Sequence, residues 1–76
     1  MTIDYNSILS VEQKRSLLQQ RITQFAAEAY QHSLNRKTCE GLEDTAGVEN
    51  ADKSLQILEA AISVHQAELD SLPAAE

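Results

Sequence analysis

The sequence predicts an all-α protein, an antiparallel hairpin of two long helices that pack in a coiled-coil-like manner. Two observations lead to this fold. Residues 11–40 contain no Gly or Pro, and seam positions from Val48 to Leu72 recur at alternating spacings of three and four. A composition with 42% hydrophobic but only 4% aromatic residues, two Gly and one Pro argues against a β-sandwich or barrel. The 76 residues make one domain, which is too short for a large enclosed core.

An apolar arm, residues 1–9, precedes the first helix. Its one charged side chain is Asp4. Its large apolar residues are Ile3, Tyr5, Ile8 and Leu9. Because apolar side chains are unfavourable in water, we expect the arm either to lie across a partner or to fold back over its own hairpin.

The first helix is predicted over residues 10–40. Ser10 and Gln13 have the spacing of a capping box, in which the hydroxyl and the Gln side chain each bond the other residue's amide. At 1.5 Å per residue this helix is about 45 Å long. One stripe of mostly apolar residues follows it: Val11, Leu18, Ile22, Phe25, Ala29, His32 and Cys39.

A turn is predicted at residues 41–44. Gly41 suits the left-handed conformation that closes many helices, because glycine has no Cβ to clash there. Asp44 or Thr45 is then placed to cap the next helix.

The second helix is predicted over residues 45–72, where Pro73 stops it and leaves 73–76 as a frayed tail. Its length is close to that of the first helix, as a hairpin requires. Its seam is regular over more than three heptads: Val48, Ala51, Leu55, Leu58, Ile62, His65, Leu69 and Leu72.

Folding the chain at the turn brings together residues whose numbers sum to about 85–88. The expected neighbours are Leu69 with Leu18, Ile62 with Ile22 and Phe25, and Leu55 with Tyr30 and Leu34.

The charge distribution supports the same register. Residues 1–37 carry five basic and three acidic side chains, whereas residues 38–76 carry one basic and nine acidic. Exposed ion pairs are individually weak, but pairs of consistent sign disfavour a parallel arrangement. The register places Lys14, Arg15 and Arg21 near Glu68 and Asp70, and Arg36 and Lys37 near Glu49 and Asp52.

Each helix carries more apolar surface than one partner helix can cover. A chain this short without a disulfide framework usually needs association to be stable, so we expect a homo-oligomer or docking on a larger protein assembly. The surplus apolar residues form the expected interface together with the arm. On the second helix they are Ile57, Ala61 and Val64, and on one flank of the first Ala26, Tyr30 and Leu34. Leu17 is a further surplus residue on the other flank of the first helix.

Bulk properties exclude several classes of partner. A net charge of −6 argues against direct nucleic-acid binding, which needs clustered Lys and Arg. No segment reaches the roughly 18 apolar residues of a membrane span, and the N-terminus lacks the features of a signal peptide. The single Cys39 cannot form an internal disulfide, so we expect a protein of a reducing compartment that is not secreted.

We expect no enzyme, metal or cofactor. His32 and His65 lie several turns apart in the hairpin, and Cys39 lies beside Glu40 and Glu43, which disfavour a thiolate. The two histidines are expected on the seam, hydrogen-bonded to Gln or Glu, where protonation in mild acid would loosen the assembly.

The chain resembles the small helical-hairpin accessory proteins of tailed bacteriophages. The resemblance rests on the start Met1-Thr2-Ile3-Asp4-Tyr5, the long polar helix, and residues 44–52 leading into residues 55–62. It implies a phage setting, in the cytoplasm of a bacterial host or in a virion, and no particular functional residue. Some such proteins are built into virions, and others act as assembly or host-takeover factors.

These observations favour a non-enzymatic structural or interaction protein that self-associates or docks on a larger assembly such as a virion. Two alternatives stay open. One is a small acidic regulator whose second helix binds and inhibits a host protein, and the other is an assembly chaperone.

Overall fold

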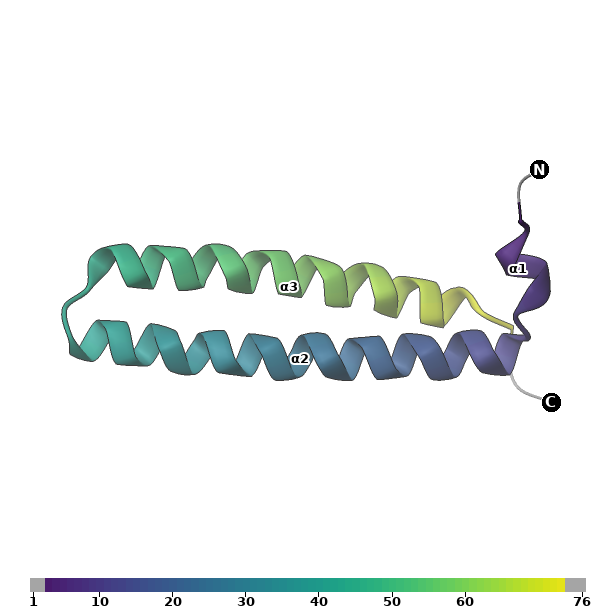
Figure 1. Cartoon of the computed structure of the whole chain (residues 1–76), viewed down its shortest axis with the longest axis horizontal. Coiled ribbons are helices and arrows are strands. Elements are labelled where there is room, and N and C mark those ends of the chain that lie inside the picture. The colour runs from purple at the N-terminus through teal and green to yellow at the C-terminus, as the bar shows by residue number, and fades with distance from the viewer. Residues whose placement is uncertain (1–2, 74–76) are drawn as a thin grey trace.

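The computed structural model confirms the all-α hairpin. It describes residues 3–73, within which there are three helices and no strand. These are α1 (Tyr5–Ile8), α2 (Val11–Gly41) and α3 (Thr45–Ser71). Figure 1 shows α2 and α3 lying side by side and antiparallel, with the chain reversing between them. The first two residues of the predicted arm and the last three of the predicted tail lie outside the described residues.

The start of α2 follows the predicted capping box. The Ser10 hydroxyl accepts from the Gln13 amide at 3.1 Å, and the Ser10 amide donates to Oε1 of Gln13 at 2.8 Å. These two bonds satisfy the amides of Ser10 and Gln13, which the start of a helix leaves without a carbonyl partner.

The end of α2 corrects the prediction for Gly41. That glycine is the last helical residue and has no positive φ, whereas Glu43 takes the left-handed conformation with φ 58°. The Glu43 amide donates to the Glu40 carbonyl at 3.1 Å, and the Asp44 amide donates to the Cys39 carbonyl at 2.8 Å. These two bonds define a Schellman motif centred two residues later than expected.

Asp44 starts α3, and a proline follows its end. The Asp44 carboxylate accepts from the Gly47 amide at 3.0 Å, one of the two caps that the sequence allowed. At the other end Leu72 is extended, as expected for a residue that precedes proline.

The arm contains a helical turn, α1, that the sequence analysis did not predict. Asp4 caps it: the Ser7 hydroxyl donates to Oδ2 of Asp4 at 2.7 Å, and the Ser7 amide donates to Oδ1 at 3.4 Å. Figure 1 shows α1 at the open end of the hairpin, projecting to one side of α2. The arm therefore does not fold back along the length of its own hairpin.

The hairpin is a single layer of helices without an enclosed core. Its principal dimensions are 51 × 33 × 14 Å, and the shortest is about the diameter of one helix with its side chains. Within residues 3–73 only Ala51 is buried, at 6% exposure. The predicted seam residues are half-buried along both helices: Val11, Leu18, Ile22, Phe25, Ala29, His32 and Cys39 on α2, and Val48, Leu55, Leu58, Ile62, His65, Leu69 and Leu72 on α3.

Hydrogen bonds between the helices show the register. Arg36 bonds Asp52, and Arg21 bonds His65, so the residue numbers of these cross-helix neighbours sum to 88 and 86. At the open end Arg15 donates to the Pro73 carbonyl at 2.6 Å. These pairs agree with the register expected from the apolar stripes.

Candidate functional site

The centre of the seam is a cluster of Arg21, Phe25 and His65. The rings of Phe25 and His65 meet edge to face, with centroids 4.9 Å apart and an interplanar angle of 70°. The Arg21 guanidinium carbon lies 5.1 Å from the Phe25 ring centroid, within the range of a cation–π contact. Nε of Arg21 also donates to Nε2 of His65 at 3.0 Å.

These contacts define the proton arrangement of His65. Its Nε2 accepts from Arg21, so Nδ1 carries the proton and donates to the Ala61 carbonyl at 2.7 Å. The expectation of a Gln or Glu partner was wrong for this histidine, because Arg21 and a backbone carbonyl one turn earlier occupy both ring nitrogens. Both ring nitrogens are therefore engaged in hydrogen bonds.

The described residues contain no group of three or more His, Cys, Asp or Glu side chains that would hold a metal ion. His32 is half-buried on α2, about three turns from His65 in the hairpin register. Cys39 is a half-buried free thiol at the turn end, where it packs against the first turn of α3. No constellation for nucleophilic catalysis is assembled from these residues.

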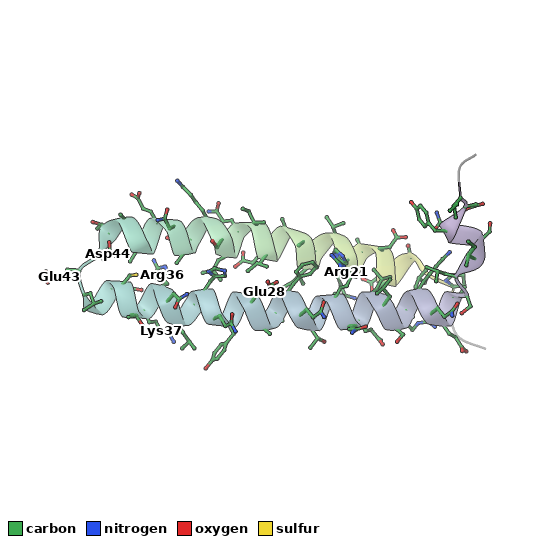
Figure 2. The ribbon with its side chains drawn as sticks, viewed as in Figure 1. Arg21, Glu28, Arg36, Lys37, Glu43 and Asp44 are labelled. Atoms are coloured by element: carbon green, nitrogen blue, oxygen red, sulfur yellow. The ribbon has the colours of Figure 1, made fainter. Side chains whose placement is uncertain are left out.

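The turn end holds an acidic hollow organised by Arg36. Arg36 bonds Asp52 across the helices at 2.6 Å and also pairs with Glu40 on its own helix. Figure 2 shows Arg36 between the two helices and Lys37 on the outer side of α2. The hollow is open to solvent and is lined by Arg36, Cys39, Glu40, Glu43, Asp44, Thr45 and Val48.

The ion pairs expected at the open end do not form. Arg15 bonds a backbone carbonyl and Arg21 bonds His65. Both ion pairs found within residues 3–73 belong to Arg36. The opposite charges of the two halves are therefore matched by direct contact near the turn only.

The surplus apolar residues divide into two groups on opposite faces of the hairpin. Successive helical residues are rotated by about 100°, so a side chain just before a seam residue and one just after it leave opposite flanks. Because α2 and α3 are antiparallel, side chains that precede their seam residues share one broad face, and side chains that follow them share the other.

We name the first group the valine face, consisting of Leu17, Ile57, Ala61 and Val64. Each directly precedes a seam residue. Ile57 is 70% exposed and Val64 68%, Leu17 is about half exposed, and Ala61 is half-buried. The hollow beside Val64 is lined also by Leu18, His65 and Glu68, which places the face over the central cluster.

The second group, the tyrosine face, consists of Ala26, Tyr30 and Leu34. Tyr30 is 66% exposed, and Leu34 and Ala26 are also exposed. Tyr30 directly follows the seam residue Ala29, so it projects from the face opposite Val64. The expected contact of Leu55 with Tyr30 and Leu34 was therefore misjudged: both side chains point away from the seam.

The arm extends the valine face at the open end of the hairpin. A second open hollow is lined by Tyr5, Asn6, Leu9, Lys14, Leu17, Leu18 and Glu68. It shares Leu18 and Glu68 with the hollow beside Val64, so the apolar surface is continuous from the arm to α3. Leu9 is half-buried there, whereas Ile3, Tyr5 and Ile8 are exposed.

Sequence reasoning placed Leu17 on the other flank of the first helix without adding it to the expected interface, and it missed Gly47. Leu17 completes the valine face on α2, and its place just before Leu18 was the available signal. At Gly47 a Cβ would lie 2.5 Å from Sγ of Cys39 and 2.6 Å from Oδ2 of Asp44. Glycine is needed there for the two helices to approach closely beside the turn.

No family model, curated protein or solved structure matches this chain. Among the described residues no helix combines the length and apolar character that crossing a membrane requires.

Proposed function

We propose that this protein is a non-enzymatic interaction module, a helical hairpin that works by associating through its exposed apolar surface. The observation that carries the proposal is the high solvent exposure of several large apolar side chains. Six large apolar side chains of the helices and arm are at least two-thirds exposed or nearly so: Ile3, Tyr5, Ile8, Tyr30, Ile57 and Val64. The contiguous part of this surface, the valine face with the adjoining arm, is of the kind that marks protein–protein contact in soluble proteins.

The local chemistry supports binding over catalysis. The histidine at the centre of the seam has both ring nitrogens occupied, and the hollows of the described residues are open to solvent. Enzyme sites instead combine a concave pocket that buries the substrate with a nucleophile, a base and an orienting group within hydrogen-bond reach of one another. The resemblance to phage accessory hairpins extends the proposal to a phage setting, with a virion or an assembly intermediate as the larger structure.

Sedimentation and partner capture test the proposal together. The purified chain is expected to sediment as an oligomer, or to be recovered in a stoichiometric complex from its source particle or lysate. A monomer whose melting temperature is independent of concentration, and which is recovered with no partner, would contradict it. In a phage setting, mass spectrometry of purified particles separates a resident component from a chaperone, since a chaperone is absent from the finished particle.

A second candidate function follows from the placement of the acidic residues. Glu49, Asp52, Glu59 and Asp70 each directly follow a seam residue of α3, so all four lie on the side of the tyrosine face. An acidic face of this kind suits a basic partner, as expected of a small inhibitor of a host protein. The affinity of such a complex should fall steeply as salt rises, whereas apolar docking should change little.

A further inference from the structure

We propose that the partner of the valine face is a second copy of this chain, and that the two hairpins pack face to face and antiparallel as a four-helix bundle. This inference rests on the proposed function and specifies the face, the partner and the orientation.

The surface area of the isolated hairpin supports a second copy. The chain exposes 5966 Å², whereas a compact protein of its mass, 8.4 kDa, exposes about 4,600 Å². The excess of roughly 1,400 Å² per chain corresponds to roughly 2,700 Å² in a dimer, within the range of obligate homodimer interfaces. One identical hairpin is therefore large enough to cover the surplus.

Charge selects the valine face over the tyrosine face. The side of the hairpin that holds the valine face carries two basic residues, Lys14 and Arg21, and two acidic residues, Glu28 and Glu68. Two copies can therefore meet through this side without net repulsion. On the tyrosine side α3 presents the four acids Glu49, Asp52, Glu59 and Asp70, and only Asp52 has a cationic partner across the helices. Two copies of that acidic side would repel each other, since like charges brought together disfavour an interface.

The positions of Arg21 and Glu28 favour the antiparallel orientation. Both directly precede seam residues and lie seven apart on α2, on the valine side. A two-fold axis that crosses α2 between them brings Arg21 of each copy opposite Glu28 of the other. The Nε of Arg21 bonds His65, which leaves the other two guanidinium nitrogens of Arg21 to donate to the Glu28 carboxylate of the other copy.

The same axis passes near the middle of the valine face. In the observed register Ile57 lies level with about residue 30 of α2, so the valine face extends from there to Leu17. The midpoint of this strip is near Gln24, which is also close to the midpoint between Arg21 and Glu28. Inverting one copy about that point places Val64 of each copy opposite Ala61 of the other.

Two variants of matched exposure test which face is used. Val64→Asp and Tyr30→Asp alter side chains that are 68% and 66% exposed, on opposite faces. By light scattering coupled to size exclusion, we expect twice the 8.4 kDa chain mass for the wild type and for Tyr30→Asp. For Val64→Asp we expect the monomer mass with the helical circular dichroism retained. The milder Val64→Ser should raise the dimer dissociation constant at least tenfold if the Asp variant fails to fold.

Cysteine crosslinking tests the orientation. In a Cys39→Ser background, Gln24→Cys lies near the proposed axis and should form an intermolecular disulfide under a copper–phenanthroline oxidant. Gln31→Cys, seven residues along the same flank, should not. Crosslinking of both variants, or of neither, would overturn the antiparallel pairing.

The outcomes separate this inference from the proposed function. A dimer that Tyr30→Asp disrupts and Val64→Asp leaves intact overturns the choice of face while self-association stands. A monomeric wild type overturns the second copy as partner, and the proposed function fails with it only if the chain also captures no other protein.

Discussion

Arg36 donates from Nε to Oδ1 of Asp52 at 2.6 Å, and this is the one ion pair that joins α2 to α3 within residues 3–73. The hydrogen bond to Asp52, followed by the charges of Asp52 and Glu40, raises the pKa of Arg36. Arg36 lies five residues before Gly41, the end of α2, so the pair ties the two helices together within two turns of the loop.

Removing this pair is expected to lower the melting temperature in low salt. Both partners are substantially exposed, so Arg36→Gln should lose most of its effect at about 1 M salt, where charges are screened beyond about 3 Å. Thermal melts of Arg36→Gln, Asp52→Asn and the double variant measure the coupling. A double variant equal to the sum of the two single variants would show that the bond contributes nothing.

Glu43→Gly is expected to stabilise the hairpin by about 1 kcal/mol. Glu43 holds φ 58° in the Schellman motif, a conformation that costs an L-residue roughly 1–2 kcal/mol and glycine little, although glycine is more flexible when unfolded. Chemical denaturation measures the change. Glu43→Ala is the control: it removes the charge but keeps the Cβ, and it should gain nothing.

The two glycines should respond oppositely to alanine. A Cβ at Gly41 meets nothing within 4 Å, so Gly41→Ala should stabilise by roughly 0.5–1 kcal/mol through helix propensity. A Cβ at Gly47 would collide with Cys39 and with the capping carboxylate of Asp44. Gly47→Ala should therefore unfold at lower denaturant than Gly41→Ala, and Cys39→Ala in the same chain should recover part of the loss.

How far the sequence predicts this fold depends on which contacts are local. The capping box at Ser10, the cap at Asp44 and the stop at Pro73 use partners within a few residues, so spacing alone identified them. The seam also follows from periodicity, because one helix can bury only one stripe against another.

The turn and the split of the exposed residues were harder to predict. A left-handed glycine is the common helix end, but here Gly41 stays helical and Glu43 takes the positive φ, which follows from how the two helix ends must meet. Likewise, the surplus apolar residues read as one interface in sequence. Only the antiparallel packing of α2 on α3 separates Val64 from Tyr30.

Acid is expected to unwind α1 while the hairpin stays folded. The hydroxyl and the amide of Ser7 donate to Asp4 and lower the pKa of its carboxyl below the ordinary 3.8. A lowered pKa in the folded state means that this stabilisation is present above the ordinary value and is lost as pH falls through the lowered one. Amide and Cα chemical shifts of residues 5–8, followed by NMR from about pH 6 to about pH 2, report it. In Asp4→Ala these shifts should already be those of the unwound arm and show no such transition.

His65 shows whether the central cluster acts by packing or by hydrogen bonding. The imidazole packs edge-on against Phe25 and accepts from Arg21, whose own side chain is exposed enough to be hydrated instead. If packing dominates, His65→Leu keeps the volume and should stay within about 0.5 kcal/mol of the wild type, whereas His65→Ala should cost about 1–2 kcal/mol. Denaturant unfolding of the two variants at one protein concentration makes the comparison. Equal losses in both would instead assign the contribution to the Arg21 bond, since leucine and alanine remove it alike.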